Sequence, residues 1–368
     1  MVVMAPHVLQ SDAGGPSGMK HMLYFAIVLS LLSLSNGMRS AASEQVFVLD
    51  KFLRESVGLD PEQIDSIHRG RAVAIVLDSP TPDQVFVFGT IHIDATPESY
   101  LRFANDFDAL RKLPSYLAVQ QFSNPPRLSD LSGFTIDAED LKQLKTCKPG
   151  DCEVQLPSEA MGQFQKSINW TAADTVNQVN QLAQQMALQA LLAYQKGGNA
   201  ALGVYRDKDH PTVVADTFEA LLRRLNSLPV YLPYLHRVLR EYPNVDLANA
   251  HTEFYWEKVN FGLKPTLRIV QQIIYRGGNP ADPVHAVALK QLYASHYFQS
   301  ALDLTICTRD ASRPNENGFY LITVKASQQA GLTGLKGGML RKVAVGKTRS
   351  SLEHTLTAIK QRVEAAPR

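Results

Sequence analysis

The stretch Val85–Phe103, "VFVFGTIHIDATPESYLRF", predicts a strand that breaks at "DATPE" and is followed directly by a helix. Its first half is rich in β-branched and aromatic residues, which is typical of a strand. The segment "DATPE" then predicts a helix that begins at Thr96 or Pro97. Apolar residues recur at helical spacing as far as Leu110, so we expect one face of this helix to lie on a sheet.

The residues before this stretch predict a second strand and two short helices. "RAVAIVLDS" precedes "DQVFVFGTIHID", and the Pro-rich "PTPD" between them indicates a hairpin connection. Between Val46 and Arg69 the pattern predicts two short amphipathic helices. Asp60 is expected to be the N-cap of the second helix and Pro61 its first residue.

After the first helix the pattern changes twice. The segment Ile136–Tyr242 is predominantly helical in pattern, most clearly in "TVNQVNQLAQQMALQALLAYQKGG". After Asn249 five strand-like runs follow one another through short turns, which predicts an antiparallel meander. The chain then ends in "SSLEHTLTAIKQRVE", where Leu352, Leu356, Ile359 and Val363 form one apolar helix face.

This order of elements resembles the START-like superfamily, also called SRPBCC or helix-grip. The resemblance is carried by "VFGTIHIDATPESYLRFANDFDALRKLPSY" and by Tyr293–Val363. It implies an α+β fold in which a curved antiparallel sheet grips a long C-terminal helix. The chain is also similar to exported bacterial proteins of unknown function. We expect START-like segments at residues 44–135 and 249–368, separated by a helical insertion at residues 136–248 and preceded by a signal peptide and upstream extension at residues 1–43.

The resemblance implies a cavity between the sheet and the C-terminal helix, with a hydrophobic small molecule or lipid as ligand. The candidate ligand-binding residues are Trp256, Ile273, Tyr275, Tyr293, His296, Tyr297 and Tyr320. Phe254 and Phe319 also fall on the predicted strands. Because aromatic side chains on strands usually pack in the core, each of them has core packing as its alternative role.

Three classes of function are consistent with this pattern. Non-covalent binding of an apolar ligand is the main expectation. An enzyme of the polyketide cyclase type on the same scaffold and a structural or interaction protein without a cavity are the alternatives. No GxSxG motif occurs, we assign no catalytic residue, and we expect no cofactor. "GLTGLKGGML" fits neither GxGxxG nor a P-loop, so we expect a flexible corner before the last helix, with a cavity gate as the alternative.

The N-terminal region predicts export. Lys20 precedes a mostly apolar run from Met22 to Leu34, and small residues follow it, which is the pattern of a secretory signal peptide. A helix of this length spans only about 20 Å, short of the roughly 30 Å of a bilayer core. We expect cleavage near Ser43 or Glu44 and a periplasmic or secreted protein.

The three cysteines suit an oxidising compartment. Cys147 and Cys152 flank the turn-forming Pro149–Gly150 pair, and we expect them to form a disulfide rather than a zinc site. Cys307 lies in an apolar strand and is expected to be a core residue. His251 and Glu253 on one strand face, with His296 elsewhere, are too few ligands at unknown distances, so no metal is assigned.

The distribution of charge bears on two possible partners, nucleic acid and an anionic membrane. The net charge of +2 provides no dense basic stripe, which excludes nucleic acid as a partner. Seven basic and two acidic residues nonetheless lie between Gly331 and Glu364, a local charge of +5. This patch is either a solvated helix face or a surface for transient docking to an anionic membrane.

Overall fold

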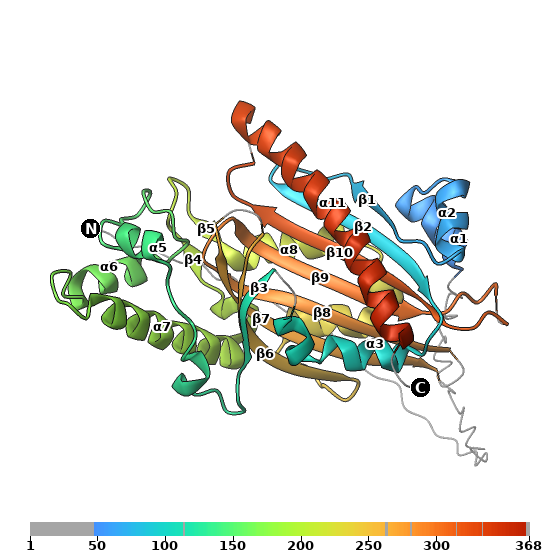
Figure 1. The fold of residues 1–368 in the computed structure, drawn as a ribbon, viewed down its shortest axis with the longest axis horizontal. Coiled ribbons are helices and arrows are strands. Elements are labelled where there is room, and N and C mark those ends of the chain that lie inside the picture. The colour runs from blue at the N-terminus through green and yellow to red at the C-terminus, as the bar shows by residue number, and fades with distance from the viewer. Residues whose placement is uncertain are drawn as a thin grey trace, which may run out of the picture. The chain divides into compact units, whose positions relative to one another are not determined.

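Strand β2 (Gln84–Ile93) organises the sheet, and it pairs on both sides. It forms the predicted hairpin with β1 (Val73–Leu77), and on its other side it pairs antiparallel with β10 (Phe319–Gln329). The strand order is β1-β2-β10-β9-β8-β7-β6-β3, antiparallel throughout. The expected α+β class with a large antiparallel sheet is confirmed (Figure 1).

This computed structural model describes residues 48–112, 115–261, 264–279, 282–313, 315–332 and 334–365. The predicted signal peptide and its cleavage point lie outside the described residues. The predicted meander consists of β6 (Ala250–Val259), β7 (Thr266–Asn279), β8 (Asp282–Ala294), β9 (Phe298–Thr308) and β10.

The edge strand β3 (Tyr116–Gln121), which pairs with β6, was not predicted from the sequence pattern. Its residues follow the first helix, yet its partner strand lies more than a hundred residues further along the chain. No local turn marks such a pairing. Strand β3 is held by β6 on one side and covered by the short helix α4 (Phe107–Arg111), whose Arg111 Nε donates to the Val119 carbonyl at 3.0 Å.

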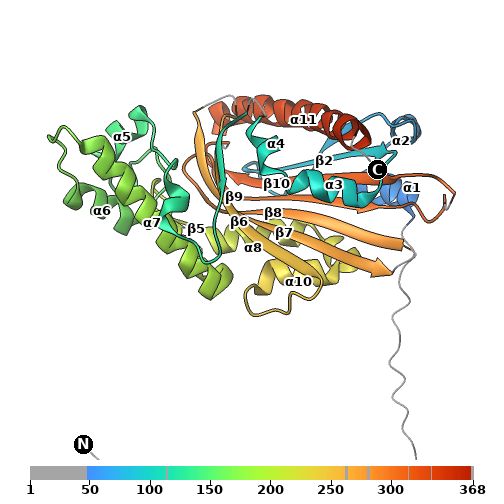
Figure 2. The same cartoon turned by 60° about the horizontal axis from the view of Figure 1, so that its bottom comes forward.

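Three helices lie on one face of the sheet. The predicted first helix is α3 (Pro97–Ala104), with Thr96 as N-cap. It ends at Ala104, with Asn105 as C-cap, earlier than the apolar repeat suggests. The Asp106 side chain accepts a hydrogen bond from the Ala109 amide and begins α4. The third is the C-terminal helix α11 (Gly334–Ala365), which crosses β1 and β2 (Figures 1 and 2).

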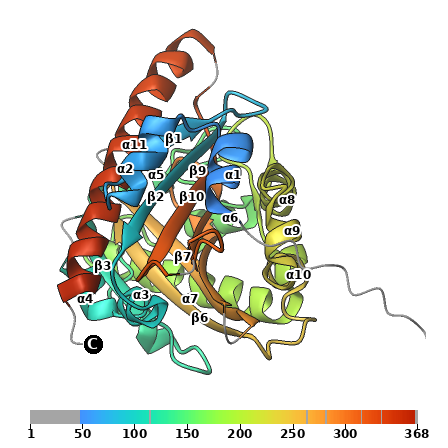
Figure 3. The same cartoon turned by 90° about the vertical axis from the view of Figure 1, so that its right-hand side faces the viewer.

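The other face is covered by the segment between β3 and β6 and by the N-terminal helices. Figure 3 shows α8, α9 and α10 on the side of the sheet opposite α11. The elements of the middle segment are η2 (Leu128–Leu131), α5 (Ala138–Leu144), α6 (Ser158–Ser167), α7 (Thr175–Gly197), η3 (Gly198–Ala201), β4 (Val204–Tyr205), β5 (Thr212–Val213), α8 (Val214–Arg224), α9 (Leu228–Tyr231) and α10 (Pro233–Glu241).

The N-terminal helices are α1 (Leu49–Phe52), which continues as the π-helical turn η1 (Leu53–Val57), and α2 (Pro61–His68). The predicted N-cap is confirmed, because Asp60 and Gln63 form a reciprocal capping box at the start of α2. Leu49, Leu53 and Ile67 are buried against Phe88 and its neighbours on the sheet.

Helix α11 begins sixteen residues before the predicted start at Ser350. The prediction of a flexible corner is therefore wrong for Gly334–Leu340, which is helical. A glycine costs a helix only about 1 kcal/mol, and a long helix with downstream packing tolerates several of them. Its predicted apolar face is confirmed, since Leu352, Leu356 and Val363 are buried on the sheet. Among the described helices, none is both long and apolar enough to cross a bilayer.

The contact between α11 and β2 depends on Gly89. A Cβ atom at this position would lie 2.7 Å from Leu352 Cδ2 and 2.9 Å from Leu356 Cδ1. The helix therefore sits directly on the strand backbone, without room for a further molecule between them at this point.

We predict opposite effects for two Gly→Ala substitutions. Gly89→Ala should lower the free energy of unfolding by about 1–3 kcal/mol because it overpacks the α11–β2 contact. Gly346 lies on α11, where an added Cβ would meet nothing within 4 Å. Gly346→Ala should therefore raise the free energy of unfolding by about 0.5–1 kcal/mol. Urea denaturation measures both values. Equal effects of the two substitutions would contradict the tight contact.

Candidate functional site

The candidate ligand-binding residues on the strands lie on the face of the sheet opposite α11. Residues of β2 that face α11 are Val85, Val87, Gly89 and Ile91, and successive strand residues alternate between faces. Leu321 of β10 pairs with Ile91 and therefore faces α11. The neighbouring Tyr320 faces the opposite side of the sheet. Carrying the register across to β7 and β6 places Ile273, Tyr275 and Trp256 on that same far face.

On that face these side chains pack against the segment between β3 and β6, and not under α11. Trp256 lies edge-on to Phe134 and donates from Nε1 to the Asp130 carbonyl at 2.8 Å. Tyr275 stacks on Tyr234 of α10, and Ile273 is fully buried beside α8 and α10. The expected lining of a space under α11 is therefore corrected: these residues, with Phe254 and Tyr293, form the core beneath the middle segment.

Phe319 differs from the other predicted residues. It faces the α11 side and is buried in the same cluster as Leu352 and Leu356. It thus contributes to the packing that fixes α11, as its alternative core role predicts.

Tyr320 belongs to a chain of hydrogen bonds that ties the N-terminal helices to the sheet. Its hydroxyl donates to Glu316 Oε2 at 2.7 Å, so it accepts from His68 Nδ1, also at 2.7 Å. The other ring nitrogen of His68 lies 2.8 Å from Asp50 Oδ1. Burial, and then the carboxylate of Glu316, raise the pKa of Tyr320. This chain of hydrogen bonds therefore joins α1, α2 and β10, and we assign it a structural role.

His296 and Tyr297 lie in the turn between β8 and β9, at a buried junction of polar groups. His296 Nε2 lies 2.7 Å from Asp140 Oδ2, and its Nδ1 lies 3.1 Å from the Glu153 carbonyl. Both partners of the ring are hydrogen-bond acceptors. Lys264 adds ion pairs to Asp140 at 3.0 Å and Glu153 at 2.9 Å.

Tyr297 joins the same junction, because its hydroxyl accepts from the Lys264 amide at 3.1 Å. Neither of the two pockets described below is lined by these side chains. The junction therefore holds α5 and the disulfide segment against the sheet.

Two further ion pairs, which no sequence motif predicted, lie on the α11 side of the sheet. Glu257 Oε1 pairs with Arg268 Nη1 at 3.0 Å across β6 and β7, and Asp303 Oδ2 pairs with Lys325 Nζ at 2.6 Å across β9 and β10. Burial raises the pKa of Glu257, although Arg268 opposes the shift. Each pair joins directly opposite positions of neighbouring strands, which is visible only after the register is known.

Lys290 is a fully buried amine on the opposite face. Its Nζ contacts the Tyr194 hydroxyl at 2.9 Å and the Asn199 side chain, and it lies 4.2 Å from the centre of the Phe218 ring. Burial lowers the pKa of Lys290 well below its usual value. Neither pocket described below reaches it, so we assign it to the core.

One described pocket is a polar cleft of about 590 Å³. Three distant segments line it: the β1–β2 turn, the segment from Lys208 to Thr217 that enters α8, and the ends of β9 and β10 with the connection to α11. We call this the polar cleft. Its lining residues are Asp83, Lys208, Asp209, His210, Pro211, Thr212, Val213, Asp216, Thr217, Gln299, Gln328, Gln329, Ala330 and Gly331.

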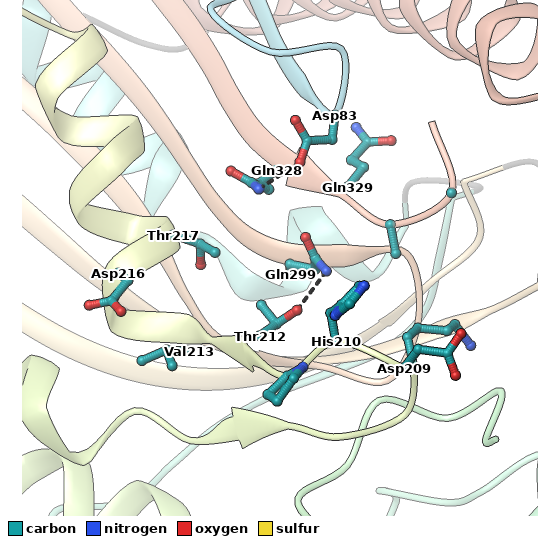
Figure 4. A pocket seen from close by; sticks show the side chains of 14 residues that line it. Asp83, Asp209, His210, Thr212, Val213, Asp216, Thr217, Gln299, Gln328 and Gln329 are labelled. Carbon is teal, nitrogen blue, oxygen red and sulfur yellow. Dashed lines mark hydrogen bonds between the residues drawn. The ribbon is translucent and has the colours of Figure 1, made fainter. Parts of the chain in front are cut away.

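Side-chain amides in the polar cleft are held in place by neighbouring groups (Figure 4). Gln299 Nε2 donates to Thr212 Oγ1 at 2.8 Å, and Gln328 Nε2 donates to Asp83 Oδ2 at 2.8 Å. The Gln329 amide also donates to the Asp83 carbonyl at 2.8 Å, which fixes the β1–β2 turn against β10. Groups arranged in this way offer hydrogen bonds to a ligand with little further ordering.

The predicted disulfide is confirmed, and it supports the rim of this cleft. Cys147 and Cys152 are bonded, with their Cα atoms 4.7 Å apart. The Cys152 amide donates to the Asp207 carbonyl, and Lys208 Nζ donates to the Cys152 carbonyl at 2.7 Å. The third cysteine, Cys307, is buried in the core as expected.

A second, smaller pocket of about 380 Å³ lies beside β3 and is bordered by Arg111, Tyr116, Gly133 and Trp256. Trp256 is the one predicted site residue that reaches a described pocket. Within the described ranges, no three His, Cys, Asp or Glu side chains are grouped closely enough to hold a metal ion. His251 and Glu253 contact each other at 2.8 Å, but His296 lies apart with Asp140.

Comparison of the chain with protein-family models, with curated proteins and with solved structures found no match. The class that the fold defines is thus an α+β protein with an eight-stranded antiparallel sheet and a long C-terminal helix.

We predict that Asp140→Asn destabilises the protein in a pH-dependent way. Burial alone would raise the pKa of Asp140, but the hydrogen bond and charge of His296, and then those of Lys264, lower it. The stabilisation is complete above the unfolded-state pKa of about 3.9 and is lost as the pH falls through the lower folded-state value. At neutral pH the loss should be on the order of 2 kcal/mol.

Denaturation curves from pH 7 to pH 2 should show the difference between wild type and Asp140→Asn shrinking below about pH 4. Glu139→Gln is the matched control, because Glu139 is 79% exposed and lies 3.9 Å from the same ammonium of Lys264. It should change stability by less than about 0.5 kcal/mol. A constant difference at all pH values would refute the role of the Asp140 charge.

Proposed function

We propose that this protein binds a small, polar, hydroxyl- and amine-bearing molecule in the polar cleft, without covalent chemistry. The observation that carries the proposal is the convergence of amide, hydroxyl and carboxylate side chains from three segments on one cavity of about 590 Å³. This volume is within the range of small-molecule sites, and a few well-placed polar groups are what orient ligands in such sites.

The charge of the polar cleft favours a neutral or cationic ligand over an anion. The lining residues include three carboxylates, Asp83, Asp209 and Asp216, and one ammonium, Lys208. The Lys208 ammonium is moreover engaged with the Cys152 carbonyl at 2.7 Å and with Asp207 at 3.6 Å. The carboxylates are therefore the charged groups that a ligand would meet.

We further propose that the scaffold is START-like, with an insertion between its halves, and that the protein is exported. The sheet under a long C-terminal helix supports the first statement, and the apolar run Met22–Leu34 together with a disulfide supports the second. On this scaffold the polar ligand replaces the hydrophobic ligand or lipid that the resemblance implies, because Leu352 and Leu356 lie directly on Gly89.

We predict that isothermal titration calorimetry detects glucosamine binding, with weaker binding of glucose and none of decanoate. Asp209→Asn with Asp216→Asn should weaken glucosamine binding roughly tenfold, since two carboxylate contacts become neutral. Both side chains are exposed, so folding should be preserved. Glu62→Gln, an exposed carboxylate on α2, is the control and should bind as wild type does.

Binding of decanoate but of neither sugar would contradict the polar ligand and favour an apolar site. Binding of glucosamine with equal affinity by wild type and the double variant would mean that the ligand occupies another site. Chemical conversion of the bound sugar would favour the enzymatic alternative.

A further inference from the structure

The N-terminal half of α11 contains several basic residues and no carboxylate of its own. From Gly334 to Leu352 the sequence contains Lys336, Arg341, Lys342, Lys347 and Arg349, and no Asp or Glu. The first acidic residue is Glu353, which accepts from the Ala74 amide. The basic excess of the C-terminal region is therefore concentrated in the first half of this helix.

One member of this group is structural. The Arg341 guanidinium donates to the Pro82 carbonyl at 2.8 Å, to Ser79 Oγ at 3.0 Å and to the Gln84 carbonyl at 3.1 Å. It therefore ties α11 to the β1–β2 turn. Together with the partly buried Val345 and the buried Leu352, it defines the side of the helix that faces the sheet.

The opposite side of the same half exposes apolar residues. Met339 is 75% exposed and Val343 is 52% exposed. At 100° per residue, Met339, Val343 and Gly346 point within about 60° of one another and roughly away from Arg341. A Cβ at Gly346 would meet nothing within 4 Å.

Exposed basic residues flank this apolar stripe on both sides. On the helical projection Lys342 and Arg349 lie on one flank and Lys347 on the other, and all three are exposed. Figures 1 and 3 show the first turns of α11 extending past the sheet, so that other elements leave this side accessible. We call these five residues the basic stripe: Met339, Lys342, Val343, Lys347 and Arg349.

We propose that the basic stripe docks the protein reversibly on an anionic lipid bilayer. An apolar centre with cationic flanks is the arrangement by which helices lie in the plane of a membrane interface, with apolar side chains below the headgroups and ammonium or guanidinium groups among the phosphates. Charge complementarity selects an anionic surface. The exposed Met339 and Val343 favour a bilayer over a soluble anion, which would offer them no apolar contact.

This docking is independent of the ligand in the polar cleft. It requires only that α11 keep its orientation, which the Arg341 contacts and the Gly89 packing maintain. Two apolar side chains provide a weak anchor, so binding should depend strongly on salt.

Vesicle flotation of the whole protein tests the proposal. Wild type should float with phosphatidylglycerol-containing vesicles at low salt, and it should stay unbound with phosphatidylcholine vesicles or at high salt. Lys342→Glu with Lys347→Glu and Arg349→Glu should reduce the partition coefficient at least about tenfold. The charge-matched control is Lys142→Glu with Lys145→Glu and Lys166→Glu. All three residues are exposed: Lys142 lies in α5, Lys145 directly after it, and Lys166 in α6.

A second variant reports on contact directly and does not reverse any charge. Met339→Trp should show a blue-shifted emission with anionic vesicles and no shift with inorganic phosphate. Failure of wild type to float, equal loss in both triple variants, or an unshifted Trp emission would each overturn the proposal. Binding to an anionic polymer in preference to vesicles would instead assign the stripe to another partner.

Discussion

The pairing of β2 with β10 is the interaction on which the rest of the structure depends. It joins a strand from the first quarter of the chain to the last strand over ten paired positions, from Phe319↔Ile93 to Gln328↔Gln84. Without it the N-terminal hairpin and the meander would be separate sheets. Gly89, against which α11 packs, is also a residue of β2. The same pairing therefore places this contact beside β10, the strand that precedes α11 in the chain.

Both proposed surfaces follow from this pairing. At the far end of β10, Gln328 meets Asp83 of the β1–β2 turn, which forms one wall of the polar cleft. The chain then passes through Ala330 and Gly331 at the cleft rim and enters α11, whose Arg341 grips the same turn. The polar cleft and the basic stripe are therefore neighbours along the chain.

The sequence predicted the elements far better than the site. Strand alternation, the Asp60 cap and the Leu352–Val363 stripe depend on neighbouring residues, so local patterns reveal them. Strand β3 depends on a distant partner, and Gly334–Leu340 is helical because the helix continues downstream. Alternation also shows that Tyr320 and Leu321 face opposite ways, but only tertiary structure decides which face α11 covers. Thr212, Gln299 and Gln328 look like solvated ends of elements until the fold brings them together.

The central claim is that a ligand enters the polar cleft and not the space between the sheet and α11. Two-dimensional NMR of the isotope-labelled protein with increasing glucosamine tests it most directly. The account predicts saturable shifts at the side-chain amides of Gln299 and Gln328 and at the Thr212 amide, with Gly89 and Leu356 unchanged. Shifts centred on Gly89 and Leu356, with the cleft amides unmoved, would contradict it.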